Sequence, residues 1–236
     1  MKLIASTFVV FMACCLASAA QIKGQNSVLI DRKSRSLSIV NQAGRILLSC
    51  PIGVGRGPLK EKSSMQDCIT PTGSFTVDVV LTDTPALNQI DQSTKEQIER
   101  NTLFRPFVKN GEGLARVFRT MNEQDFNRDG TPDKAYGRAF LGLQGKNTGP
   151  KLIAAGKSAR WYSIALHGTP NEAKAIGGAT SEGCIHLSSA ALKKILDAHL
   201  IGVGTAVYIN DGIGDVDLVK RKSFVDDNQE QVRMRN

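Results

Sequence analysis

Alternating apolar and polar residues run from Ser27 to Gly55, and this pattern constrains the fold more than any other feature of the sequence. Two clusters of turn-forming residues, Asp31–Ser34 and Asn41–Gly44, divide the pattern into three segments. Because successive side chains of a strand point to opposite sides, such alternation predicts strands with one face in the core. We therefore predict three short antiparallel strands at the start of a β-sheet.

Three later segments add strands, and two others form helices. A β-branched run from Phe75 to Leu81 follows a Pro/Gly turn, an apolar segment leads up to His167, and the residues GTAVYI form the last strand. One helix is expected near a cap at Ser93. Another begins after Ser188 and presents one apolar face, made of Leu192, Ile195, Leu196 and Leu200. The fold class is therefore mainly β with a few short helices.

The composition is that of an ordinary globular protein. With 236 residues, the chain is long enough for one substantial core. Apolar residues make up 41% and charged residues 22%, which excludes global disorder. The net charge of +8 comes from scattered basic residues, and only 6% of the residues are aromatic. Nucleic-acid binding is therefore not expected, and the charge indicates attraction to a polyanionic surface such as a cell envelope.

Residues 1–20 have the three-part pattern of a secretory signal peptide: Lys2, an apolar stretch from Leu3 to Leu16, and small residues up to Ala20. The apolar stretch is short for a bilayer span, although a retained anchor helix is the alternative. We expect an exported protein of the periplasm or cell envelope, with no transmembrane segment in the mature chain. The mixed charges of residues 211–236 predict a mobile C-terminal tail.

Export changes the interpretation of the cysteines. Cys14 and Cys15 leave with the signal peptide, and Cys50, Cys68 and Cys184 remain. Cys50 and Cys68 flank one Gly/Pro-containing loop, so they are the candidates for a disulfide in an oxidising compartment. Cys184 is then an unpaired thiol, which in an exported protein is a liability unless it is buried or used.

Cys184 lies within the segment LHGTPNEAKAIGGATSEGCIHL, which also holds two of the three histidines. A strand holds His167 at a sheet edge, while Gly177, Gly178 and Gly183 let the returning chain turn sharply before Cys184. An imidazole within hydrogen-bond reach would convert the thiol into a thiolate–imidazolium pair, as a cysteine acyltransferase requires. Backbone N–H groups at Gly183 and Cys184 are candidates for an oxyanion site. Spacing alone does not separate such a pair from bystander residues.

The string HGTP…IGGATSEGCIHL resembles the signature of the bacterial L,D-transpeptidases of the YkuD type, in which an HGT turn is followed by S-x-G-C-I-R. Three more segments resemble strands of that family in the same order: TPTGSFTV, YGRAFLGL and GTAVYI. The similarity runs, with gaps, from about Asn26 to Asn210. After the signal peptide, it implies one catalytic domain over residues 21–210, a β-sandwich with a few helices and an insertion at about 84–133 before the active-site strand.

The resemblance also implies the chemistry. Cys184 matches the nucleophile of the family and His167 its general base, while Ser181 and Gly183 match positions that shape the turn. The substrate-binding positions would be His186, Gly168 and Thr169. Cys184 would form a thioester with a peptidoglycan stem tetrapeptide and release D-alanine, with no required cofactor. The acceptor stays open: an amine of another stem peptide, a lysine of a wall-anchored protein, or water as in an L,D-carboxypeptidase. Such activity belongs to cell-wall biogenesis and the maintenance of cell shape.

Two residues depart from the family pattern. Glu182 stands where many relatives have histidine, and we assign it no role. His186 stands where the family usually has arginine, which is permanently charged and can hold a carboxylate by two hydrogen bonds. Substrate choice or pH dependence is therefore expected to differ, and a non-catalytic peptidoglycan-binding relative is an alternative.

Two metal hypotheses accompany this interpretation. Asp125, Asn127, Asp129 and Asp133 have the spacing of a calcium loop, with Gly130 at the sixth position. The twelfth position is not glutamate, and Asx-rich turns without metal share this pattern, so a structural calcium ion is one of two alternatives. His167, Cys184 and His186 could alternatively bind zinc in a metal-dependent peptidase, although their spacing is unusual for such a site.

Overall fold

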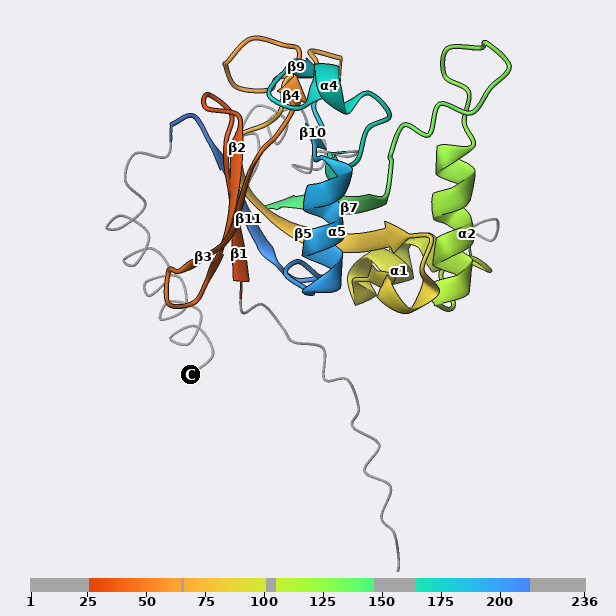
Figure 1. Cartoon of the computed structure of the whole chain (residues 1–236). Coiled ribbons are helices and arrows are strands. Elements are labelled where there is room, and N and C mark those ends of the chain that lie inside the picture. Colours follow the sequence, from red (N-terminus) through yellow and green to blue (C-terminus); the bar gives the residue numbers. More distant parts are fainter. Residues whose placement is uncertain (1–25, 65, 101–104, 147–163, 213–236) are drawn as a thin grey trace, which may run out of the picture.

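Most strands pair into one curled mixed sheet (Figure 1). The computed structural model describes residues 26–64, 66–100, 105–146 and 164–212. The nine strands of this sheet are β1 (Asn26–Asp31), β2 (Ser36–Asn41), β3 (Ile46–Pro51), β5 (Gly73–Thr82), β6 (Gln89–Ile90), β7 (Ala139–Lys146), β8 (Ala165–His167), β10 (Ile185–His186) and β11 (Ala206–Asn210). Two further strands, β4 (Val54–Gly55) and β9 (Ala179–Ser181), pair with each other. The predicted mainly β class is confirmed.

Short helices connect the strands. They are the 3-10 helix η1 (Pro85–Leu87) and the α-helices α1 (Gln92–Glu99), α2 (Gly111–Asn122), α4 (Glu172–Ala175) and α5 (Ser189–Asp197). Within the described ranges, none of these helices has the length and apolar character needed to cross a bilayer. The predicted signal peptide and residues 213–236 of the predicted tail lie outside the described residues.

The order of strands across the sheet is β10-β8-β7-β5-β11-β1-β2-β3, with β6 paired to β5. The first three strands form the antiparallel meander that the alternating sequence predicts. The last strand, β11, lies between β1 and β5 in the middle of the sheet. It runs parallel to β1, with Val28 opposite Val207 and Ile30 opposite Ile209, and antiparallel to β5. This central position requires pairing between distant parts of the sequence.

Helix α5 packs an apolar face onto the sheet. Its N-cap is Ser188, as predicted, and the Ser188 hydroxyl accepts a hydrogen bond from the N–H of Ala191 at 3.1 Å. Leu192 and Ile195 are fully buried in a core cluster that also takes residues from β1, β2, β5, β7, β8, β10 and β11. Because these strands span the sheet, its curl brings both of its ends against one core (Figure 1).

A second, smaller core lies in the insertion between β5 and β7. Helix α2 begins at the N-cap Asn110, whose side chain accepts a hydrogen bond from the N–H of Gly113. Its residues Leu114 and Phe118 are buried against Leu81 of β5 and Val108. Helix α2 stands at the right-hand side of the molecule, apart from α5 (Figure 1). The insertion therefore has its own apolar contacts with the sheet.

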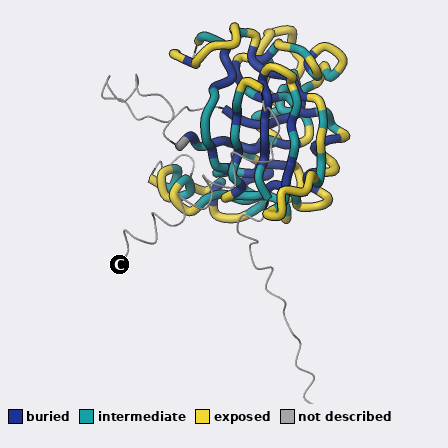
Figure 2. Tube along the Cα trace, turned by 90° about the vertical axis from the view of Figure 1, so that its left-hand side faces the viewer, coloured by how far each residue is buried: buried dark blue, intermediate teal, exposed yellow. Residues whose placement is uncertain are grey.

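Burial is concentrated in the crossing strands, while the connections at both ends of the molecule are exposed (Figure 2). The chain after β11 is held at its start by a buried cation. Arg32, of which 2% is exposed, donates from Nε to Asp211 Oδ1 at 2.7 Å and forms an ion pair with that carboxylate. The N–H of Gly212 donates to Asp31 Oδ1 at 2.9 Å. The first residue of the predicted mobile tail is therefore fixed to the sheet.

Candidate active site

The parallel pairing of β8 with β10 sets the geometry of the site. Leu166 lies opposite Ile185, and His167 lies opposite His186. Leu166 and Ile185 are fully buried in the core. Because side chains alternate along a strand, the two histidines share the other face, and Cys184, one residue before Ile185, lies on the histidine side. The register brings the predicted nucleophile and the predicted base to one face at the sheet edge.

Cys184 is half-buried beside the start of β8. The backbone of Ala165, which this register places opposite Cys184, makes a hydrogen bond to the thiol. His167 lies two residues further along β8 than Ala165, so its side chain is on the same face of the sheet as that of Ala165. Burial raises the pKa of Tyr136, and a negative charge on Cys184 adds to that effect.

His167 is held by rings on several sides, and only 6% of it is exposed. Its ring centroid lies 5.1 Å from that of Tyr136, 6.2 Å from that of Phe140 and 4.9 Å from that of His186. Its Nδ1 lies 2.6 Å from the carbonyl oxygen of Gly168. A carbonyl can only accept, so this contact assigns the proton to Nδ1 and leaves a lone pair on Nε2. The imidazole can therefore accept a proton at Nε2.

Burial makes the neutral forms of both groups the stable ones. It lowers the pKa of His167 to about 4, with a further contribution from His186, against the raising effect of hydrogen bonds to the backbone of Gly168 and Ala135. Burial also raises the pKa of the Cys184 thiol to about 11. A resting thiolate–imidazolium pair, as predicted from the sequence, is therefore disfavoured. The low dielectric of the site penalises each charge, which residue spacing cannot reveal.

Ser181 and Gly183 build the turn that carries Cys184. The Ser181 hydroxyl donates to the carbonyl of Cys184 at 2.6 Å and accepts from the N–H of Gly183 at 3.1 Å. Gly183 has a φ of 129°. A Cβ added there would lie 2.9 Å from the carbonyl oxygen of Ile69, so both backbone and space require glycine. The N–H of Gly183 is occupied by Ser181, which removes it from the predicted oxyanion donors.

His186 lies next to His167 and is fixed through its backbone. Its N–H and carbonyl exchange hydrogen bonds with Gly53, each at 2.9 Å. Burial lowers the pKa of His186, and its buried Nδ1 has no hydrogen-bond partner among the described residues. A neutral imidazole at this position cannot supply the permanent charge of arginine. Glu182, the other departure, is exposed and pairs with Arg56 at 3.0 Å.

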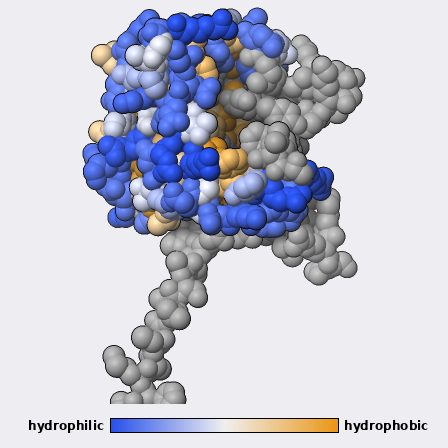
Figure 3. Space-filling view, turned by 90° about the vertical axis from the view of Figure 1, so that its right-hand side faces the viewer, coloured by the Kyte–Doolittle hydropathy of each residue, from blue (hydrophilic) through white to orange (hydrophobic). Residues whose placement is uncertain are grey.

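A cleft of about 1030 Å³ lies between the insertion and α5, and its lining includes Gly168 but neither His167 nor Cys184. Gly168 and Thr169, predicted as substrate-binding positions, line it. Charged residues of both signs also line it: Asp83, Arg119, Glu123, Lys134, Arg138, Glu172, Lys193 and Asp197. The molecular face on the α2 side is mostly hydrophilic, and the strongest apolar colour lies in a recess (Figure 3). The volume of this cleft is sufficient for a peptide segment, and no sequence pattern indicated it.

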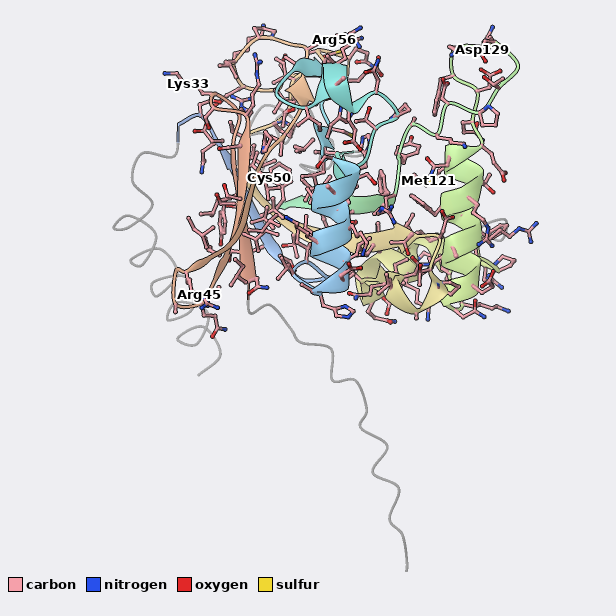
Figure 4. All side chains as sticks on the ribbon, viewed as in Figure 1. Lys33, Arg45, Cys50, Arg56, Met121 and Asp129 are labelled. Atoms are coloured by element: carbon pink, nitrogen blue, oxygen red, sulfur yellow. The ribbon has the colours of Figure 1, made fainter. Side chains whose placement is uncertain are left out.

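The predicted disulfide is not formed, because its two cysteines lie in different surroundings. None of the three described cysteines forms a disulfide. Cys50 of β3 packs against the main core. The charge of Lys194 in α5 acts on its thiol. The Sγ of Cys68 instead donates to the carbonyl of Gln66 at 3.5 Å in the loop before β5. Figure 4 shows Cys50 among the strands, well separated from Arg56 at the end of the molecule that carries the loop.

In the described part of the chain, no three His, Cys, Asp or Glu side chains lie close enough together to hold a metal ion. A preformed ligand set is therefore not seen there for either metal hypothesis. The rings of His167 and His186 pack edge to face, and zinc binding by these histidines and Cys184 stays a prediction. Asp125 accepts from the N–H groups of Asp129 and Gly130 within its own loop. Asp133 accepts from the N–H groups of Phe126 and Asn127.

The loop of Asp125, Asn127, Asp129 and Asp133 extends beyond α2, away from Arg56 (Figure 4). Asn127 and Asp129 each accept a hydrogen bond from the N–H two residues further on, as in Asx turns, whereas Asp125 and Asp133 accept from N–H groups across the loop. Calcium binding stays a prediction, which calorimetric titration would test.

Sequence reasoning missed three residues of the site. Tyr136 and Phe140 flank the His167 ring, and Lys62 exerts an electrostatic effect on Cys184. Tyr136 begins the YGRAFLGL segment and Phe140 lies within it, so the aromatic residues of that segment were the available signal. Lys62 lies in a loop with no periodic pattern, and nothing in the sequence distinguished it from other lysines.

Comparison with known proteins assigns the chain to a family. Residues 25–209 match the family profile of YkuD, the L,D-transpeptidase catalytic domain. The match covers most of the chain, and the protein belongs to this family. No curated protein sequence matches the chain.

Solved structures show low sequence similarity to the chain. Bd1075 of Bdellovibrio bacteriovorus is 17% identical, with 88% of this chain and 56% of that chain covered and a TM-score of 0.47. The helical cell shape determining protein Pgp2 from Campylobacter jejuni is 15% identical, with 82% and 50% covered and a TM-score of 0.46. L,D-transpeptidase 1 of Mycobacterium tuberculosis is 15% identical, with 78% and 60% covered and a TM-score of 0.35. The chain thus spans 50% to 60% of the length of these three solved chains.

Proposed function

We propose that the protein is a peptidoglycan L,D-transpeptidase that uses Cys184 as its nucleophile and His167 as its general base. One observation carries the proposal: the β8–β10 register puts the thiol and the imidazole on one face, with Nε2 of His167 unprotonated. Family membership supports peptidoglycan as the substrate class. It also supports a role in cell-wall biogenesis outside the cytoplasm, in agreement with the leader-like pattern of residues 1–20.

The first half-reaction acylates the enzyme. The Sγ of Cys184 attacks the carbonyl carbon at the L-centre of the third stem residue, while Nε2 of His167 takes the thiol proton. The S–C bond forms, the C–N bond to the terminal D-alanine breaks, and the imidazolium returns the proton to the leaving amine. Because both resting groups are neutral, the proton moves during the attack, and no thiolate needs to be stored.

The second half-reaction transfers the acyl group to an amine. The acceptor nitrogen attacks the thioester carbonyl and gives a proton to Nε2 of His167. The C–S bond then breaks, and the leaving sulfur of Cys184 takes that proton from the imidazolium and becomes a thiol again. The cleft lined by Gly168 and Thr169, the two residues after the base in the chain, presents charges of both signs. Those charges suit a stem peptide that carries both carboxylates and an amine, and we propose this cleft as the place where one stem peptide binds.

Mass spectrometry of both the protein and its products tests the proposal. The purified protein would be incubated with a disaccharide tetrapeptide prepared from peptidoglycan. We expect a covalent adduct on Cys184 with the mass of the donor minus D-alanine, followed by a cross-linked dimer. Cys184→Ser is the inactive control, and Cys50→Ala is the matched control because it removes a thiol from a remote strand.

The products decide between the alternatives. A tripeptide product without dimer would replace transpeptidation with L,D-carboxypeptidase activity. A stem peptide joined to a lysine of an added wall protein, in place of the dimer, would assign the acceptor to a protein. Binding to peptidoglycan that persists in Cys184→Ser, with no adduct on the wild-type protein, would overturn the enzymatic proposal and indicate a binding module.

A further inference from the structure

A buried ion pair lies in the loop between β4 and β5. The Nζ of Lys62 is 2.7 Å from Oδ1 of Asp67, and the two side chains are only 1% and 13% exposed. Lysine is rarely buried to this extent, because removal of an ammonium from water costs several kcal/mol. A loop that only connects two strands has no need of such a group, so the placement of Lys62 requires an explanation.

Asp67 is the centre around which this loop is organised. Besides Lys62, it accepts hydrogen bonds from the N–H of Ile69 at 3.0 Å, of Ser63 at 2.7 Å and of Ser64 at 3.0 Å. Burial alone would raise the pKa of Asp67, but these hydrogen bonds together outweigh it and hold the pKa well below its usual range. The carboxylate therefore stays charged, and its bonds fix the position of the ammonium.

The loop lies directly against the turn that carries the nucleophile. The N–H of Arg56 donates to the carbonyl of Ser181 at 2.8 Å. The carbonyl of Ile69 lies so close to Gly183 that it leaves no room for a Cβ. Asp67 and Ile69 are joined by a hydrogen bond, so the ion pair and the Cys184 turn are held by one set of contacts.

Other charged and titratable groups near the thiol act differently from Lys62. Glu182, in the same turn, raises the pKa of Cys184, and its exposed carboxylate is paired with Arg56. The two imidazoles on the shared face are neutral in the resting site, since burial lowers the pKa of each. Tyr136 has a raised pKa and is neutral as well. The positive charge that acts on Cys184 from a buried position is that of Lys62.

We propose that Lys62 is a positioning residue for the nucleophile: its buried ammonium favours the anionic form of Cys184, and Asp67 limits how much of that positive field reaches the sulfur. In the reaction, the ammonium would stabilise negative charge as it develops on the sulfur during attack and during thioester breakdown. The inference rests on the proposed function for the role of Cys184. It adds a charged group from a different loop to that function.

The two members of the pair should have opposite effects on the thiol. Removal of the cation, as in Lys62→Gln, withdraws positive charge, so we expect Cys184 to react with iodoacetamide roughly threefold to tenfold more slowly at pH 8. Neutralisation of the anion, as in Asp67→Asn, leaves the cation uncompensated, so we expect faster alkylation by a similar factor. Lys62→Arg keeps the charge and should retain a rate near that of the wild type.

The measurement would follow alkylation of each cysteine by peptide mass mapping at several pH values between 7 and 9.5. Cys50 is the internal control, because its environment contains Lys194 and not Lys62. Both Lys62→Gln and Asp67→Asn should lower the urea midpoint, because each leaves a buried polar group without its partner. If the pair had a purely structural role, both variants would change the alkylation rate of Cys184 in the same direction. The electrostatic role predicts changes of opposite sign.

Equal alkylation of Cys184 in wild type, Lys62→Gln and Asp67→Asn would overturn the proposal. A change of the same sign in both variants, or an equal change at Cys50, would also overturn it. If Lys62→Gln does not fold, the predicted acceleration in Asp67→Asn remains decisive, and its absence refutes the inference. Alkylation of Cys184 needs no turnover. A protein that forms no thioester would therefore fail the proposed function and still show the effect of Lys62, so the two proposals are tested separately.

Discussion

Two thiols of this protein share several properties and differ in their neighbours. Cys50 of β3 and Cys184 of the active-site turn are both half-buried, and burial raises the pKa of each to about 11. Each also lies within the electrostatic influence of a lysine, Lys194 for Cys50 and Lys62 for Cys184. By these measures alone, the two cysteines are indistinguishable.

The difference lies in what surrounds each sulfur. Cys50 packs against apolar residues of the main core, and its lysine is exposed on α5. The thiol of Cys184 makes a hydrogen bond with the backbone and shares a face with two imidazoles, and the lysine that acts on it is buried. A raised thiol pKa therefore reports burial, whereas a base and a fixed cation on the same face distinguish the candidate nucleophile.

The largest expected effect separates the two thiols directly. Cys184→Ala removes the atom that forms the thioester, so we expect turnover of a tetrapeptide substrate to fall by roughly 10³-fold or more. Cys50→Ala should leave turnover within about twofold and cost about 1 kcal/mol of stability through a small cavity. Parallel assays of D-alanine release would check this, and equal losses in the two variants would break the comparison.

The turn before Cys184 gives the next largest effect. Gly183→Ala combines a φ of 129° with a contact of 2.9 Å to a carbonyl oxygen, so we expect a loss of about 2–3 kcal/mol and most of the activity. Gly177 is the matched control, because its φ is 79° and a Cβ there would meet nothing within 4 Å. Gly177→Ala should cost about 1 kcal/mol, as urea denaturation would show. Similar midpoints for both variants would contradict the packing account.

The buried imidazole predicts a stability effect of pH. The pKa of His167 is lowered to about 4 in the folded protein, so the unfolded chain binds the extra proton first as pH falls below about 6.5. The free energy of unfolding is unaffected by this group above about pH 6.5. It decreases as pH falls towards 4, and the loss at pH 5 is about 2 kcal/mol. His186 acts in the same direction. His167→Gln should therefore show a smaller drop in urea midpoint between pH 7.5 and 5 than wild type, and an unchanged drop would argue against the assignment.

The smallest expected effect concerns the departure from the family pattern. His186→Arg restores a permanent charge beside the base, at a position where burial favours a neutral imidazole. We expect turnover on a tetrapeptide substrate to be retained or raised a few-fold, measured as D-alanine release. Abolished turnover in a variant that remains folded would show that the site is built around histidine.

The sequence was sufficient where local patterns decide the structure. Alternation predicted β1 to β3, and the cap at Ser188 predicted the start of α5. The central place of β11 could not be predicted, because it depends on pairing between residues far apart in the chain. The charge states of Cys184 and His167 were also beyond reach, since burial decides them. Lys62 and Asp67 gave no signal, because an ion pair inside an irregular loop follows no period.

The position of β11 has a consequence for the order of folding. It separates β5 from β1 and pairs with both, so the sheet has an open gap until residues 206–210 have taken their place. Contacts between such distant segments form slowly, since the whole intervening chain must be closed into a loop first. The strands that align the thiol with the imidazole therefore gain their full support only after nearly all of the described chain has been synthesised. Assembly of the reactive centre is thus coupled to the arrival of the final strand.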